Sequence, residues 1–254
     1  EIMPSLVGSE MCIRDRAWIQ RLSGIPESTG RAGSYQAEFH PAYGSDLRTD
    51  RRSEILATVL QSDIEKIKQT LESVDNHAFE LAVDTILAAK KVYVIGIRSC
   101  APLAKFLTFY LNLICEDVVE VDTNSSSEIF EQLIRIGEED VIIGISFPRY
   151  SMRTLKALEF ASNRKAKVIT LTDSVNSPMN LYSSCNLIAK SDMASIVDSL
   201  VAPLSVINAL VVALCMKKQD DVIETLETLE DIWDEYQVYS RDELEPVEDE
   251  VRIK

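Results

Sequence analysis

The chain has 254 residues, 46% of them hydrophobic and 26% charged, so it is long enough and apolar enough to bury a sizeable core. Its formal net charge of −15 excludes a generic nucleic-acid-coating surface, which needs clustered lysine and arginine. Every apolar run is interrupted well before 18 residues, so the sequence predicts no membrane-spanning helix.

The five cysteines are odd in number, widely spaced and free of any CxxC pair, and the two histidines are isolated. This pattern indicates reduced thiols in a cytoplasmic protein. It also predicts no metal site, because no tight histidine and cysteine cluster is present. We expect no cofactor.

The first 50 residues carry no sustained periodicity. The chain begins with glutamate rather than methionine, and its opening segment, EIMPSLVGSEMCIRDR (Glu1–Arg16), resembles adapter-derived sequence that contaminates predicted proteins. It has neither the order of a signal peptide nor that of a transit peptide. The following stretch, Ala17–Asp50, is rich in Gly, Pro, Ser and Tyr and predicts coil. We therefore expect residues 1–50 to be a non-native or disordered N-terminal segment.

Helical periodicity begins at Ser53, after which apolar residues recur every three to five positions as far as Leu71. This spacing predicts a helix of about five turns. A second helix is expected over Asn76–Ala89, capped by Asp75 or Asn76. We expect these to be linker helices over residues 51–90, ahead of a domain over residues 91–239 and an acidic tail over residues 240–254.

Beyond residue 90, short apolar runs alternate with helical patterns. The expected strands are Val92–Ile95, Val118–Val121, Val141–Ile145, Val168–Leu171 and Leu187–Ala189. The expected helices are Ala101–Ile114, Ser127–Arg135, Met152–Asn163, a weaker Pro178–Tyr182, Ser195–Met216 and Asp220–Tyr236. Repeated β–α–β alternation predicts an α/β fold with a doubly wound, five-stranded parallel sheet of the flavodoxin-like type.

Hydroxyl-rich loops follow several of these strands, at the edge where doubly wound sheets bind ligands. They read GIRSC (96–100), TNSSSE (123–128), SFPRYSMRT (146–154) and TDS (172–174). Helix capping explains any one of them. Several at one edge favour an anion site, in which hydroxyls, helix N-termini and arginine contact phosphate oxygens. The candidate ligand-binding residues are Gly96, Arg98, Ser99, Ser126, Ser146, Arg149, Ser151 and Thr154.

Over roughly Ser53–Tyr239 the chain resembles the SIS (sugar isomerase) domain of RpiR-type (MurR/RpiR) transcription regulators. The resemblance rests on VYVIGIRSCAPLAKFLTFYLNLI, SSSEIFEQLIRIGEEDVIIGISFPRYSMRTLKALEFA, VITLTDSVNSPMNLY and SDMASIVDSLVAPLSVINALVVAL. It matches Ser99 to the serine of the family's first loop, and Ser146, Ser151 and Thr154 to the Ser/Thr positions of the second. In two places the sequence departs: the usual Ser-Gly pair reads Phe147 and Arg149, and Arg153 replaces a common acidic residue.

The resemblance implies a phosphorylated-sugar effector and, in the full-length parent, operator DNA read by a helix-turn-helix of about 75 residues that precedes the SIS domain. No whole helix-turn-helix is recognisable in Ala17–Asp50, so residues 1–50 are interpreted as the remnant of that region, and operator DNA is a partner of the parent. The expected function is the effector-sensing domain of a bacterial regulator of carbohydrate metabolism, without catalytic residues.

Two other functions stay open. A sugar-phosphate isomerase or related SIS enzyme needs a base at the pocket, and only Glu128 and Asp173 follow strands closely enough. A pure dimerisation module is the third reading, since Ile196–Met216 is apolar nearly all round and fits either a subunit interface or the domain's own core. We expect a homodimer or a higher homo-oligomer.

Overall fold

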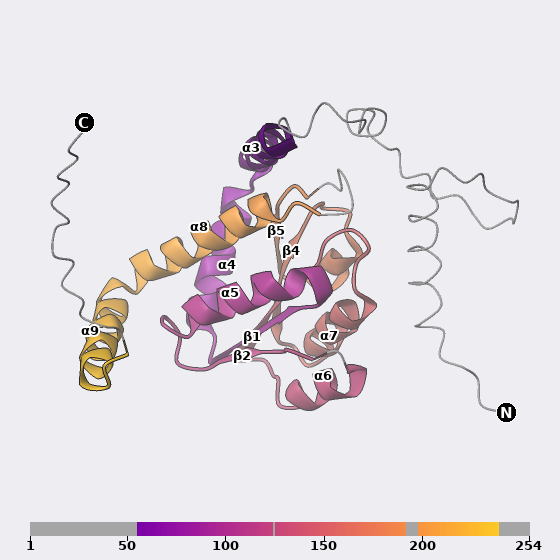
Figure 1. Ribbon diagram of the computed structural model, residues 1–254. Coiled ribbons are helices and arrows are strands. Elements are labelled where there is room, and N and C mark those ends of the chain that lie inside the picture. Colours follow the sequence, from indigo (N-terminus) through magenta and orange to yellow (C-terminus); the bar gives the residue numbers. More distant parts are fainter. Residues whose placement is uncertain (1–54, 124, 192–197, 239–254) are drawn as a thin grey trace, which may run out of the picture. The chain divides into compact units, whose positions relative to one another are not determined.

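A five-stranded, entirely parallel sheet forms the centre of the fold, with the strand order β2-β1-β3-β4-β5 (Figure 1). This computed structural model describes residues 55–123, 125–191 and 198–238. The strands are β1 (Lys91–Gly96), β2 (Val118–Glu120), β3 (Asp140–Ile145), β4 (Lys167–Thr172) and β5 (Cys185–Ile188). The predicted α/β fold with a doubly wound five-stranded sheet is confirmed.

Helices cover both faces of the sheet, which is why the central strands are apolar without interruption. The helices are α3 (Ile55–Ser73), α4 (Asn76–Ala88), α5 (Ala101–Leu111), α6 (Ser126–Gln132), α7 (Met152–Asn163), α8 (Val201–Lys217) and α9 (Gln219–Glu235), with short 3-10 turns η1 (Arg98–Cys100) and η2 (Pro178–Tyr182). One core cluster joins α4, α5 and α8 to the sheet through residues such as Val94 and Ile143. The other joins α6, α7 and η2 to it through Ile95 and Ile142.

The strand order reverses between β1 and β3. From β1 the chain passes through α5 to β2 on one side, and then returns to build β3, β4 and β5 on the other. The β1–β3 pairing runs from Lys91 opposite Asp140 to Gly96 opposite Ile145, so both strands end at the same level. Their following loops therefore emerge side by side at the carboxyl edge of the sheet, where such folds bind ligands.

Helix α8 begins later than its apolar pattern predicts. We predicted Ser195 as its first residue, but residues 198–200 are not helical and the helix starts at Val201. Residues 195–197 lie outside the described part of the chain. Pro203 stands in the first turn of α8, the one place where a helix tolerates proline, because the missing N–H would have no intrahelical partner there.

Helix α4 contributes Ala82, Val83 and Ile86 to the same core cluster as β1, so it is packed into the domain. The division into linker helices over 51–90 and a domain over 91–239 stays a prediction. The assignments of residues 1–50 and 240–254 also stay predictions, and these residues lie outside the described part of the chain. In the described part of the chain, no single helix combines the length and apolar character needed to cross a membrane. Helices α8 and α9 meet both criteria only when taken together, and they bend by 98° where they meet.

Candidate functional site

The loop after β1 turns sharply into η1 and α5. Gly96 makes that turn possible, because a Cβ atom here would lie 2.6 Å from the carbonyl oxygen of Cys100. Arg98 has a left-handed backbone, with φ of 62°, and both Arg98 and Ser99 are exposed. Cys100 is buried, and burial raises the pKa of its thiol, with hydrogen bonds to the Phe147 backbone and the Ser99 side chain acting in the opposite direction.

The loop after β3 is held by its own hydroxyl groups. The buried Ser146 Oγ accepts a hydrogen bond from the backbone N–H of Ser151 (3.1 Å). The Ser151 Oγ in turn caps α7 by accepting from the backbone N–H of Thr154 (3.3 Å). Thr154 is fully buried, and its own hydroxyl has no hydrogen-bond partner within the described structure. A buried hydroxyl without a partner is costly, so this one is available to a ligand or an ordered water.

The loops after β1 and β3 touch. The buried side chains of Cys100 and Phe147 belong to the same core cluster, which joins the end of η1 to the start of the loop after β3. The structure therefore brings seven predicted residues to one edge of the sheet: Gly96, Arg98 and Ser99 from the loop after β1, and Ser146, Arg149, Ser151 and Thr154 at the loop after β3. Whether each contacts a ligand stays a prediction.

Each of these loops holds an arginine in a left-handed conformation: φ is 62° at Arg98 and 65° at Arg149. A side chain disfavours this backbone by roughly 1–2 kcal/mol, and non-glycine residues kept there are concentrated at ligand sites. Arg149 forms an ion pair with Asp198 (3.6 Å), whose side chain is only 17% exposed. Two cations at the carboxyl edge suit an anionic ligand.

Ser126 is placed differently. It begins α6, a helix of seven residues, in the loop after the edge strand β2, and it is exposed. Its neighbours bond among themselves: Ser125 and Ser127 share a hydrogen bond of 2.9 Å, and the Thr123 hydroxyl donates to the Glu128 carboxylate. That carboxylate, the candidate base, is therefore engaged within its own loop. Ser126 as a ligand residue stays a prediction.

Tyr150 links the second loop to the loop after β4, a contact that the sequence did not predict. Its hydroxyl donates to Asp173 Oδ1 (2.7 Å), which also accepts from Thr172 Oγ1 (3.2 Å). Thr172 further shares a hydrogen bond of 2.9 Å with Ser177. Burial, reinforced by the Asp173 hydrogen bond, raises the pKa of Tyr150 to about 12. The Asp173 carboxylate, the other candidate base, thus accepts hydrogen bonds from two hydroxyl groups and links the loop after β4 to the loop that carries Arg149.

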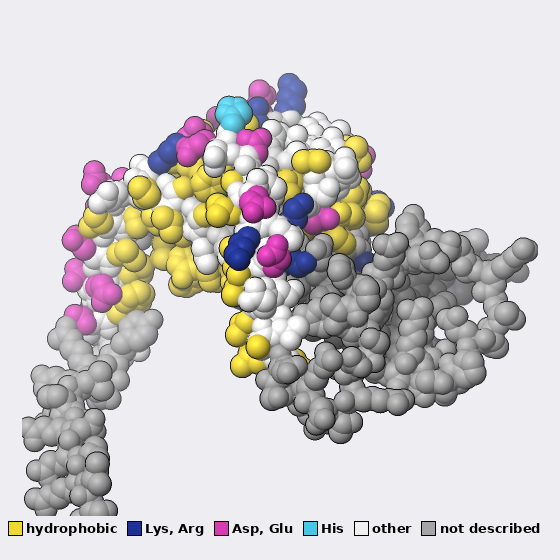
Figure 2. Space-filling view, turned by 90° about the horizontal axis from the view of Figure 1, so that it is seen from above, with side chains coloured by type: hydrophobic (Ala, Val, Ile, Leu, Met, Phe, Trp, Pro, Cys, Tyr) yellow, Lys and Arg dark blue, Asp and Glu magenta, His cyan; other side chains and the backbone are white. Residues whose placement is uncertain are grey.

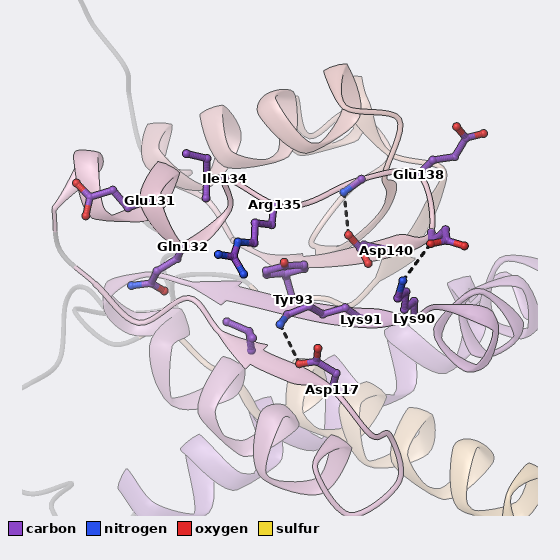
Figure 3. Close-up of a pocket in the computed structure, with 13 residues that line it drawn as sticks. Lys90, Lys91, Tyr93, Asp117, Glu131, Gln132, Ile134, Arg135, Glu138 and Asp140 are labelled. Carbon is purple, nitrogen blue, oxygen red and sulfur yellow. Dashed lines mark hydrogen bonds and ion pairs between the residues drawn. The ribbon is translucent and has the colours of Figure 1, made fainter.

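A separate groove lies at the opposite, amino edge of the sheet (Figure 3). It is lined by Tyr93 together with charged residues that pair among themselves: Lys91 with Asp117 (2.9 Å) and Lys90 with Glu139 (3.4 Å). The groove is open to solvent and its cations already face carboxylates. We therefore place the candidate anion site at the carboxyl edge, where the two loops meet.

The SIS domain family model matches residues 85–213 of the chain. The chain is similar to an uncharacterized HTH-type transcriptional regulator of Clostridium perfringens, with 26% identity over 140 residues, covering 55% of this chain and 50% of the relative. A second such regulator, from Haemophilus influenzae, is 22% identical over 173 residues, covering 66% and 59%. The chain thus spans little more than half the length of the curated relatives that it matches.

Solved structures share the fold. The sugar isomerase domain of the RpiR transcription factor from Sphaerobacter thermophilus has a TM-score of 0.67 and 28% identity, covering 70% of this chain and 98% of that one. The Vibrio vulnificus NanR protein, complexed with ManNAc-6P, has a TM-score of 0.62 at 19% identity, covering 72% and 71%. Phosphoheptose isomerase from Neisseria gonorrhoeae has a TM-score of 0.54 at 16% identity, covering 64% and 97%. The fold therefore occurs both in regulators and in an enzyme.

The Tyr150–Asp173 contact predicts a pH-dependent contribution to stability. The unfolded chain loses the tyrosine proton near pH 10, whereas the folded protein keeps it until about pH 12, so stability falls as the pH rises between these values. At neutral pH, Tyr150→Phe should lower the free energy of unfolding by about 1 kcal/mol. Its deficit relative to the parent should shrink at about pH 11.

Urea unfolding at both pH values measures this. The control is Tyr236→Phe, at a tyrosine that is 71% exposed, which should follow the parent at both. A Tyr150→Phe deficit that stays constant from neutral pH to about pH 11 would contradict the assigned role.

Proposed function

Because this chain belongs to the SIS domain family, we propose that its domain binds a phosphorylated sugar at the carboxyl edge and senses it for a bacterial DNA-binding regulator of carbohydrate metabolism. The observation that carries this is the convergence of two loops at the strand-order reversal. Each loop holds hydroxyls and one arginine in a left-handed conformation. The name HTH-type transcriptional regulator, carried by both curated relatives, supports the regulatory role. Operator DNA is proposed as a partner of the full-length parent.

We place the ligand's phosphate at the loop after β3. Ser146, Ser151 and Thr154 supply hydroxyls around the first turn of α7, whose N-terminus favours negative charge. Arg149 supplies a cation that can donate two parallel hydrogen bonds. Gly96, Arg98 and Ser99 complete the proposed site from the loop after β1, and Ser126 borders it from the loop after β2. ManNAc-6P, named with the Vibrio vulnificus structure, is a suitable first probe because it is a phosphorylated sugar.

We favour sensing over catalysis. Both candidate bases have their carboxylates engaged: Glu128 accepts from Thr123, and Asp173 accepts from Tyr150 and Thr172. A base that takes a proton from a sugar carbon must be directed at that carbon, whereas these hydrogen bonds direct both carboxylates at protein groups. His77, the one histidine in the described residues, lies in the first turn of α4 rather than at a strand end.

Loss of the loop hydroxyls should weaken binding without unfolding the protein. Ser146→Ala and Ser151→Ala each remove a hydrogen bond to a charged oxygen, which should cost about 1.5–3 kcal/mol, or roughly tenfold to a hundredfold in affinity. Ser151→Ala should also lose about 1 kcal/mol of stability as the cap of α7. Calorimetric titration with ManNAc-6P and a panel of aldose and ketose phosphates measures this.

The matched control is Ser162→Ala, in the last turn of the same helix, which should bind like the parent. If Ser146→Ala and Ser151→Ala both bind the panel as tightly as the parent, these hydroxyls only cap the helix and the ligand lies elsewhere.

The same panel separates sensing from turnover. Incubated with the protein, each sugar phosphate should isomerise no faster than in buffer, because hydrogen bonds within the protein hold the Glu128 and Asp173 carboxylates. Product analysis by chromatography measures it. Protein-dependent isomerisation that disappears in Glu128→Gln would establish the alternative function, a sugar-phosphate isomerase or related SIS enzyme.

We further propose that the chain forms a homodimer, and the exposed apolar residues of α3 are the best candidates for its interface. Leu56 is 70% exposed, Leu60 52% and Leu71 72%, with Ile64 and Ile67 between them on the same side of the helix. Figure 2, which views the molecule from above, shows hydrophobic side chains on the surface among Lys, Arg, Asp and Glu side chains. Helix α8, which its sequence suggested for the interface, instead buries seven residues in the domain itself.

Charged residues on α3 should dissociate the dimer. Leu56→Glu with Leu60→Glu places two carboxylates on the exposed apolar side of the helix, so light scattering at micromolar concentration should give the mass of a monomer where the parent gives a dimer. Val175→Glu, at an isolated residue that is 71% exposed, is the control and should stay dimeric. A monomeric parent would contradict the proposal.

A further inference from the structure

A short chain of contacts joins the candidate site to helix α3. It starts at the ion pair between Arg149 and Asp198 (3.6 Å). The next residue, Ser199, donates a hydrogen bond from its hydroxyl to the Asp63 carboxylate on α3 (2.6 Å). The Ser199 carbonyl accepts a hydrogen bond from the Ser191 hydroxyl (3.0 Å). The site loop and α3 are therefore separated by two residues, Asp198 and Ser199.

Two polar side chains of α3, Asp63 and Thr70, bond to residues near the candidate site. Of its 19 residues only Thr70 is buried, and the Thr70 hydroxyl accepts from the backbone N–H of Lys190 (2.9 Å). Asp63 and Thr70 are seven residues apart and so lie on the same side of the helix. Helix α3 also packs against α8. A change at Ser199 therefore acts directly on a contact that helps to position α3, a helix whose residues are mostly exposed.

The charge of Asp198 conflicts with an anionic ligand. Its carboxylate is mostly shielded from water and lies beside Arg149. A phosphate that enters between the two loops meets this carboxylate and needs the same guanidinium. The phosphate and the carboxylate carry like charges and repel each other, so a bound phosphate weakens the Arg149–Asp198 pair.

We propose that Asp198 is an internal competitor for Arg149, and that phosphate binding releases Asp198 and, through Ser199 and Asp63, loosens α3. This inference rests on the proposed function for the identity of the ligand. By this route an occupied site would act on α3, the first described helix in the chain. Breaking the Arg149–Asp198 pair should therefore have the same effect on α3 as binding the ligand.

The ligand-free protein tests the coupling directly. Asp198→Asn and Arg149→Gln each remove the ion pair, and amide hydrogen exchange from Asp63 to Thr70 should become roughly threefold to fivefold faster in both. Exchange in β1 and β3 should stay at the parent's rate, which verifies folding. Glu139→Gln is the matched control, because it removes the Lys90–Glu139 pair at the opposite edge of the sheet and should leave α3 unchanged. Parent-like exchange of α3 in both variants would overturn the proposal.

The second arm uses ManNAc-6P as the probe, followed by the panel above if it does not bind. The bound probe should accelerate exchange in α3 of the parent, and Asp198→Asn should bind it roughly threefold to tenfold more tightly because the competing charge is gone. Ser199→Ala should keep the parent's affinity within about twofold and lose the acceleration.

Failure of every probe to bind the parent would count against the proposed function, while the ligand-free variants would still decide the coupling. Binding without any change in α3 would overturn the coupling alone.

Discussion

The pairing of β1 with β3 is the constraint on which the rest of the molecule depends. These two strands are buried on both faces, and their six-residue register ends with Gly96 opposite Ile145. Because the chain turns to opposite sides of the sheet after them, the helices that follow, α5 and α7, leave the same edge on different faces. Their N-terminal loops are then forced to lie side by side. The candidate site, with its two loops, two arginines and several hydroxyls, is a consequence of that register.

Most of this architecture could be predicted from local patterns in the sequence. A buried strand such as β3 and an amphipathic helix such as α7 leave a periodic signature within a dozen residues, and their boundaries matched closely. The hydroxyl groups of the two loops were predictable for the same reason, since they directly follow a strand and precede a helix. Arg149 was predictable as a cation near the site, although its left-handed backbone was not.

Contacts between residues far apart in the chain could not be predicted from the sequence. Asp198 was expected inside a helix because the apolar pattern of α8 runs back to Ile196, and only Pro203 marks the true first turn. Its pairing with Arg149 spans 49 positions. The Tyr150–Asp173 hydrogen bond, 23 residues apart, likewise follows from the alignment of β3 with β4. No periodicity records such pairs.

The left-handed backbone at Arg149 has a consequence for how this loop evolves. At φ of 65° a glycine pays no steric penalty, and the family resemblance places a glycine at this position. Arginine and glycine can therefore exchange here with the loop's path preserved, since the backbone needs no rearrangement to accept either. The loop's charge can thus be altered by one substitution while the fold stays constant, so relatives on the same scaffold are free to diverge in the anions they select.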